Sequence, residues 1–117
     1  VGQITDTYVN SYDRMLADPS FSDRELAAIA SGYTSLLQRS ADALKDLQGI
    51  VNPSDLSMTD KDRLDVVDKT YEELSRLKGL TDYFTRKNIA VSQVRARKKQ
   101  DMERFLALYG SDEQKYW

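Results

Sequence analysis

The sequence predicts an all-α fold, an elongated three-helix bundle or helical hairpin with a long C-terminal helix. Apolar residues recur at helical spacing along most of the 117 residues. Two capping signatures mark where helices begin. The chain contains only two prolines and five glycines, so long uninterrupted helices are possible. At this length we expect residues 1–117 to form a single helical domain.

The first predicted helix covers residues 3–17. Its apolar positions repeat at helical intervals and are Ile4, Tyr8, Tyr12, Met15 and Leu16. It ends at Asp18-Pro19, because a proline disfavours helical geometry in the residue before it. A second proline, in Asn52-Pro53-Ser54, indicates the turn before the last helix.

The second predicted helix begins with a capping box. Ser22 can cap the N-terminus, Glu25 can reach back to it, and Phe21 and Leu26 occupy the positions of a hydrophobic staple. One apolar stripe follows, made of Leu26, Ile29, Tyr33, Leu36, Leu37, Leu44 and Leu47. We expect the helix to end near Gln48-Gly49, since glycine is common just past a helix C-terminus.

The third predicted helix begins after Thr59, with Asp62 as the reciprocal capping residue. Its predicted buried face consists of Leu64, Val67, Tyr71, Leu74, Leu77, Leu80, Phe84, Val91, Val94, Phe105 and Leu108. The apolar spacing shortens beside Gly79, so a bend or break there is an open alternative to a continuous helix over residues 60–109. Gly110 then ends the helix.

Short connections predict antiparallel neighbours. We expect the second helix to pack along the first half of the third. The short first helix then covers the second half of the third helix or pairs with the second helix.

Several kinds of chemistry are excluded by residue types that the chain lacks. Cysteine and histidine are both absent, which rules out disulfides, Ser–His and cysteine nucleophiles, imidazole bases and the usual zinc sites. Four acids near the start of the third helix, Asp60, Asp62, Asp65 and Asp68, lack the glycine and distant glutamate of a calcium loop. Acids in a first helical turn are expected from the helix dipole. Catalysis by carboxylates alone is a distant alternative, because slender helical packing offers no cleft to hold two acids apart. We therefore predict no catalytic, cofactor or metal site.

A basic segment is the strongest compositional feature. The chain has a net charge of −2, yet residues 86–104 contain seven basic and two acidic residues, which makes that stretch +5 and the rest −7. Such a run can bind the phosphates of nucleic acid or anionic lipid head groups. A solvated helix face is the favoured interpretation, because Val91 and Val94 continue the apolar stripe through it.

The C-terminal Tyr116-Trp117 is a second candidate for partner binding, with folding back on the bundle as an equal alternative. Together the candidate partner-binding residues are Arg86, Lys87, Arg95, Arg97, Lys98, Lys99, Tyr116 and Trp117.

Four strings along the chain carry a resemblance to a known family. They are ITDTYVNS (residues 4–11), LSMTDKDR (56–63), YFTRKNI (83–89) and ALYG (107–110) with the terminal YW. In this order and spacing they resemble the C-terminal region of a conjugative-transposon transfer protein of Bacteroides-type bacteria, from a family of unknown function. A more distant likeness is to the minor pilus subunit of type IV secretion.

The resemblance implies a non-catalytic structural or adaptor subunit of a conjugation apparatus that acts in DNA transfer through protein–protein contacts. It also implies an exported protein of the periplasm or cell envelope, of which this chain, beginning at Val1, is a piece. The partners would be other subunits of the apparatus or a second copy of the chain. The alternative is a direct nucleic-acid or anionic-surface binder that uses residues 86–99. No stretch in the chain is apolar enough for a membrane span.

Overall fold

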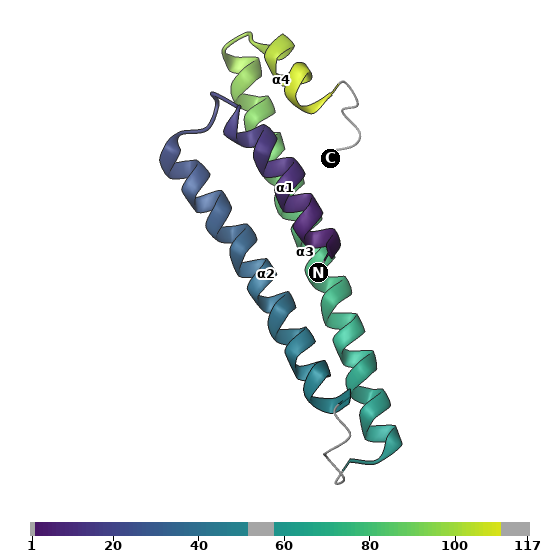
Figure 1. Ribbon diagram of the computed structural model, residues 1–117. Helices are drawn as coiled ribbons and strands as arrows, with labels where there is room; N and C mark the ends of the chain where they lie inside the picture. Colours follow the sequence, from purple (N-terminus) through teal and green to yellow (C-terminus); the bar gives the residue numbers. More distant parts are fainter. Residues whose placement is uncertain (1, 52–57, 111–117) are drawn as a thin grey trace.

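The computed structural model describes residues 2–51 and 58–110, and within them all regular structure is helical. The elements are α1 (Gly2–Leu16), α2 (Asp23–Val51), α3 (Asp60–Lys98) and α4 (Met102–Tyr109) (Figure 1). The molecule is elongated, with extents of 64 × 27 × 16 Å. The predicted all-α, elongated fold is confirmed.

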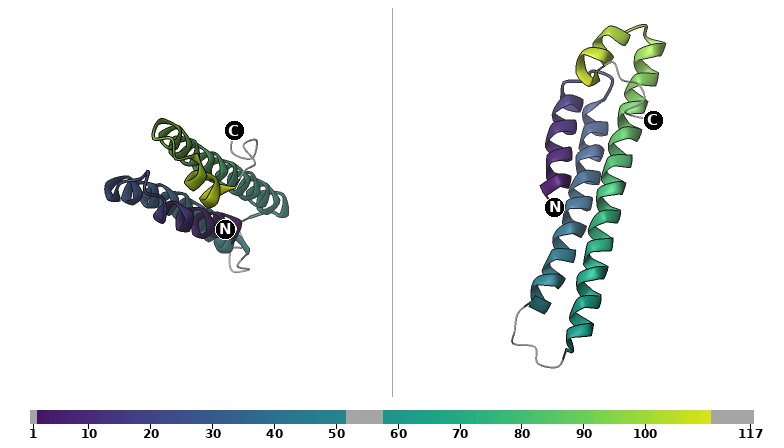
Figure 2. Two further views of the ribbon diagram at one scale, coloured as in Figure 1. Left: turned by 90° about the horizontal axis from the view of Figure 1, so that it is seen from above. Right: turned by 90° about the vertical axis from the view of Figure 1, so that its right-hand side faces the viewer.

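Helices α2 and α3 form a long antiparallel hairpin, and α1 packs against both of them (Figures 1 and 2). Because α1 is short, it covers only the half of the hairpin that contains the N-terminal part of α2 and the C-terminal part of α3. Helix α4 folds over that same end and contacts α3. The antiparallel packing expected from the short connections is present, but α2 extends beyond the predicted first half of the third helix and also contacts Thr85 and Arg95. The other half of the hairpin is two helices thick.

Both predicted capping boxes are present. The backbone N–H of Glu25 donates to Ser22 Oγ at 3.2 Å, and the Ser22 N–H donates to Glu25 Oε1 at 3.0 Å. At α3, Asp62 N–H donates to Thr59 Oγ1 at 3.1 Å and Thr59 N–H donates to Asp62 Oδ2 at 3.3 Å. Each box satisfies two of the amide groups that a helix start leaves without partners.

The helix ends differ from the prediction in two places. Helix α2 continues through Gly49 to Val51. Helix α3 continues through Gly79 without a break, but the continuous helix predicted over residues 60–109 is divided into α3 and α4. The last helix is broken at residues 99–101 instead, where Gln100 has a φ of 55° and Asp101 N–H donates to the Ala96 carbonyl at 2.8 Å. This turn redirects the chain so that the side chains of α4 reach the core. The predicted turn at Asn52-Pro53-Ser54 lies outside the described residues.

The core is concentrated at the three-helix end. Its buried members are Met15, Phe21, Leu26, Ile29, Tyr33, Ile89, Ala96, Phe105 and Tyr109. Tyr33 is central to it: its ring stacks on Tyr8 at a centroid distance of 4.8 Å and meets Phe84 edge-on at 5.0 Å. These aromatic pairs join α1, α2 and α3.

The predicted buried face of α3 was wrong at six positions, which are exposed: Leu64, Val67, Tyr71, Leu80, Val91 and Val94. The face that α3 buries is rich in small hydroxyl side chains and consists of Thr70, Leu77, Thr81, Thr85, Ile89, Ser92, Gln93 and Ala96.

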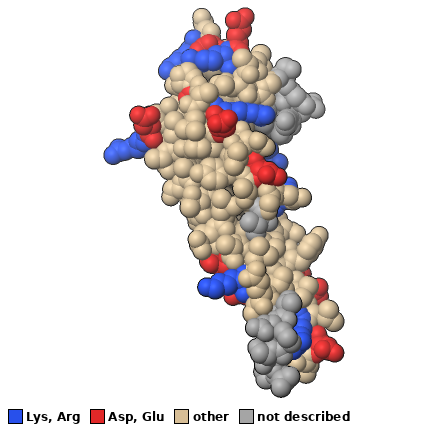
Figure 3. Space-filling model, in the orientation of Figure 1, with Lys and Arg blue, Asp and Glu red and all other residues tan. Residues whose placement is uncertain are grey.

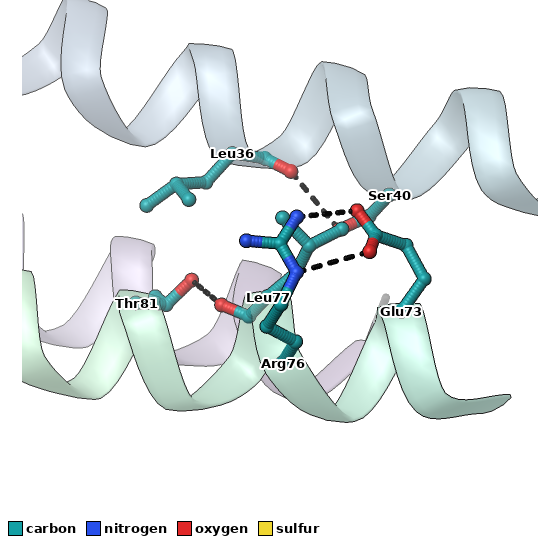
Figure 4. A network of polar contacts seen from close by, with 6 residues as sticks. All are labelled: Leu36, Ser40, Glu73, Arg76, Leu77 and Thr81. Carbon is teal, nitrogen blue, oxygen red and sulfur yellow. Dashed lines mark hydrogen bonds and ion pairs between the residues drawn. The ribbon is translucent and has the colours of Figure 1, made fainter. Parts of the chain in front are cut away.

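Hydroxyl side chains can be buried on α3 because they donate hydrogen bonds to backbone carbonyls of the same helix. Thr81 Oγ1 donates to the Leu77 carbonyl at 2.8 Å, and Thr85 Oγ1 donates to the Thr81 carbonyl at 2.9 Å. On the facing helix, the fully buried Ser40 likewise donates to the Leu36 carbonyl at 2.9 Å (Figure 4). Their donors are satisfied, and their small size lets the two helices approach closely.

Candidate functional site

The exposed apolar residues of the C-terminal half of α3 form an ordered surface. We define the outer face of α3 as Leu80, Phe84, Lys87, Val91, Val94 and Lys98. The positions are spaced 4-3-4-3-4, which places them along one side of the helix as in a coiled-coil seam. Leu80 and Val91 are each 37% exposed and Val94 is 50% exposed, while both lysines are exposed. Phe84 is half-buried because its ring reaches into the core.

Two shallow grooves adjoin this face. One, of about 290 Å³, lies between α2 and α3 and is lined by Gly32, Ser35, Leu36, Arg39, Leu80, Tyr83 and Phe84. The other, of about 380 Å³, is lined by Lys87, Ala90, Val91, Val94, Arg95 and Lys98. Their described lining residues include four basic side chains and no acidic one. The outer face is therefore an apolar strip in a positively charged setting.

Arg95 is held in place at the edge of this face by an ion pair with α2. Its guanidinium lies 2.7 Å from Glu25 Oε2, and Arg95 Nη1 donates to Glu25 Oε1 and to the Ser20 carbonyl, each at 2.9 Å. The hydrogen bond from Arg95, assisted by the Ser22 amide, lowers the pKa of Glu25 to about 2. The same bond raises the pKa of Arg95. Arg95 thus links α3 to the capping box of α2.

The structure separates the predicted basic residues into groups. Lys87, Arg95 and Lys98 line one groove, and the Lys87 ammonium lies 5.9 Å from the centre of the Tyr83 ring. Arg86, Arg97 and Lys99 are also exposed but line neither groove. Tyr116 and Trp117 lie outside the described residues.

The exposure of Val91 and Val94 was not predicted from the sequence. A signal for this was present, because the heptad stripe that contains them places lysines at two of its six positions. A buried seam rarely accepts an unpaired lysine. The stripe was therefore better suited to a solvent-facing surface than to a core.

A second exposed apolar area lies on the N-terminal half of α3, beside and beyond the start of α1. Leu64 is 62% exposed and Tyr71 is 73% exposed. Beside the start of α1, a pocket is lined by Gln3, Ile4, Tyr71, Leu74, Ser75 and Lys78. On the face of the molecule shown in Figure 3, charged side chains gather toward the two ends and leave the middle mainly uncharged.

Exposed apolar side chains beside cations, as on the outer face of α3, can contribute to binding another macromolecule. Within residues 2–51 and 58–110, no group of three or more acidic side chains is placed to hold a metal ion. None of the helices in this part of the chain is long and apolar enough to cross a membrane. Comparisons with protein-family models, with curated proteins and with solved structures found no match to this chain.

Proposed function

We propose that this chain is a non-catalytic structural or adaptor subunit of a bacterial conjugation apparatus of the type IV secretion kind, acting in the periplasm or cell envelope. It would act in DNA transfer by binding neighbouring proteins through the sides of its helices. The resemblance of its sequence strings to a conjugative-transposon transfer protein supports the choice of machine. The observation that supports protein binding is the exposure of Val91 and Val94 in the middle of a regular helical seam.

A partner helix on the outer face would gain the free energy of burying these side chains. Apolar surface contributes roughly 25 cal/mol for each Å² removed from water. The six seam positions extend from Leu80 to Lys98, a rise of 18 residues along α3, which corresponds to about 27 Å at roughly 1.5 Å per residue. That length matches the helix-in-groove mode of peptide recognition, in which anchors recur every three or four residues.

Direct binding of nucleic acid through residues 86–99 is the less favoured alternative. The Arg95 guanidinium already binds Glu25 and the Ser20 carbonyl, so Arg95 is a weak candidate for phosphate contacts. Phosphate contacts would also not explain why Val91 and Val94 are exposed on this face. Binding that depends on phosphates weakens steeply as the salt concentration rises, whereas apolar docking does not.

A conjugation assay tests the proposal. Deletion of the gene from its conjugative element should abolish transfer, and the wild-type gene supplied in trans should restore it. The variant Val91→Asp/Val94→Asp should not restore transfer, because it places charge in the middle of the outer face. Val9→Asp is a control for charge on an exposed valine, since Val9 is 61% exposed on α1 and lines neither groove.

Normal transfer frequency in the deletion strain would reject the role in conjugation. Equal restoration by the Val91→Asp/Val94→Asp and Val9→Asp variants would reject the outer face as the binding surface. Immunoblots of all strains are needed to show that each variant accumulates to the wild-type level.

A further inference from the structure

Resting on the proposed function, we infer that the outer face of α3 binds an acidic amphipathic helix of a partner protein. The argument depends on the order of side chains along the seam. Val91 and Val94 are adjacent positions of the seam, and Lys87 and Lys98 lie about one helical turn to either side of them. An apolar strip bracketed by cations selects a helix that carries apolar residues bracketed by carboxylates.

The wider surroundings carry the same sign of charge. Arg39 lies on the α2 wall of the groove that contains Leu80 and Tyr83. Glu25, beside the second groove, is engaged by Arg95 through both of its carboxylate oxygens. The cations of Lys87 and Lys98 are exposed, and a docked helix with glutamates along its flanks would neutralise them.

A second copy of this chain would not fit as well. If two outer faces paired in antiparallel fashion with Val91 opposite Val94, then Lys87 of each copy would face Lys98 of the other. If they paired in parallel and in register, each lysine would face its own equivalent. Both arrangements bring like charges together across the seam, which disfavours self-association.

The shape of the surface favours a helix over a flat membrane. The groove beside Leu80 has one wall on α2 and one on α3, and its α2 wall includes the small residues Gly32 and Ser35. A concave surface between two helices accommodates a third helix lying along them. An anionic bilayer would contact the lysines but could not enter this groove.

Two designed peptides of roughly 21 residues, or three heptads, supply the test. Both carry leucine at the a and d positions. One has glutamate at the e and g positions, and the other has lysine there. Fluorescence anisotropy of labelled peptide, titrated with the full chain at about 0.15 M salt, measures binding. The wild-type chain should bind the acidic peptide, and it should bind the basic peptide at least about tenfold more weakly.

Charge reversal on the protein should reverse this preference. Lys87→Glu/Lys98→Glu should bind the basic peptide and lose the acidic one. Arg86→Glu/Lys69→Glu makes the same change in net charge at exposed positions that line neither groove, and it should retain the wild-type preference. Val91→Ser/Val94→Ser should weaken binding of the acidic peptide about tenfold, by loss of apolar contact. Circular dichroism of each variant verifies that it is folded.

Several outcomes would overturn the inference. They are equal binding of the two peptides, loss of binding in the Arg86→Glu/Lys69→Glu control, or tighter binding of a scrambled acidic peptide. Tighter binding of single-stranded DNA or of phosphatidylglycerol vesicles, unaffected by the valine substitutions, would do the same. If the chain does not prefer the acidic peptide but gene deletion abolishes transfer, only the acidic partner is rejected. If the chain prefers the acidic peptide as expected but gene deletion leaves transfer normal, only the role in conjugation is rejected.

Discussion

The Tyr109 hydroxyl donates a hydrogen bond of 2.8 Å to Asp18 Oδ2, joining residues that are 91 positions apart in the chain. Asp18 is only 4% exposed, and its carboxylate also accepts from the Ser92 hydroxyl and, at 2.9 Å, from the Ser20 amide. One side chain in the turn between α1 and α2 thus binds α3 and α4. Burial, with the Asp18 carboxylate beside it, raises the pKa of Tyr109.

Removing this carboxylate should destabilise the three-helix end. Asp18→Ala leaves the buried hydroxyls of Ser92 and Tyr109 without their acceptor, so we expect the free energy of unfolding to fall by about 3 kcal/mol. Tyr109→Phe should cost about 1 kcal/mol, because it removes a single donor. Urea unfolding followed by circular dichroism measures both. Asp13→Ala, at an exposed position on α1, is the control, and a loss at Asp18 no larger than the loss at Asp13 would contradict the assignment.

The Glu25–Arg95 ion pair should make stability depend on pH. The pKa of Glu25 falls from 4.5 to about 2 on folding, chiefly through its hydrogen bond from Arg95. A lowered folded-state pKa stabilises the protein above the unfolded value and loses that contribution as the pH falls toward the folded value. The wild-type chain should therefore be more stable than Glu25→Gln at pH 7, and the difference should shrink between pH 4.5 and about 2.

Thermal melts of wild type and Glu25→Gln across this pH range provide the measurement. Glutamine keeps an oxygen that can accept from the Ser22 amide, so the substitution isolates the charge. In the Arg95→Ala background the pH-dependent difference should largely disappear. A difference that persists there would show that Arg95 does not cause it.

Two glycines inside helices should respond in opposite directions to alanine. A Cβ at Gly79 has nothing within 4 Å, so Gly79→Ala should raise the free energy of unfolding by about 0.5–1 kcal/mol through helix propensity. A Cβ at Gly32 would lie 2.5 Å from Phe84 Cζ. Since the Phe84 ring packs edge-on against Tyr33, Gly32→Ala should cost about 1–2 kcal/mol by overpacking.

Chemical denaturation compares these two variants, and Phe84→Leu serves as the background control. With the aromatic ring removed, Gly32→Ala should become neutral or stabilising. If it stays equally destabilising in the Phe84→Leu background, then the ring is not the cause.

The Tyr33 hydroxyl lies 2.6 Å from Thr85 Oγ1, and it is the donor because the Thr85 hydroxyl already donates to the Thr81 carbonyl. Tyr33→Phe should therefore cost about 1 kcal/mol. Thr85→Val should cost more, since it leaves the buried Tyr33 hydroxyl without an acceptor. Equal costs for the two variants, measured by urea unfolding, would argue against this assignment of donor and acceptor.

The sequence by itself determined that the chain is helical and where α2 and α3 begin. Ser22 with Glu25 and Thr59 with Asp62 form their capping boxes through contacts between residues three apart, so they form wherever the chain is helical. The apolar stripe of α2 is also local, and it faces the core as predicted at Leu26, Ile29 and Tyr33.

Only the tertiary structure decided which side of α3 is buried. Threonine and serine read as polar in a sequence, yet on a helix they donate to their own backbone carbonyls and can pack closely against α1 and α2. Once those helices occupy the hydroxyl-rich side, Val91 and Val94 face solvent. The role of Asp18 could not be predicted from the sequence either. Its partners Ser92 and Tyr109 lie far along the chain, and they meet Asp18 only when α3 and α4 pack at this end of the bundle.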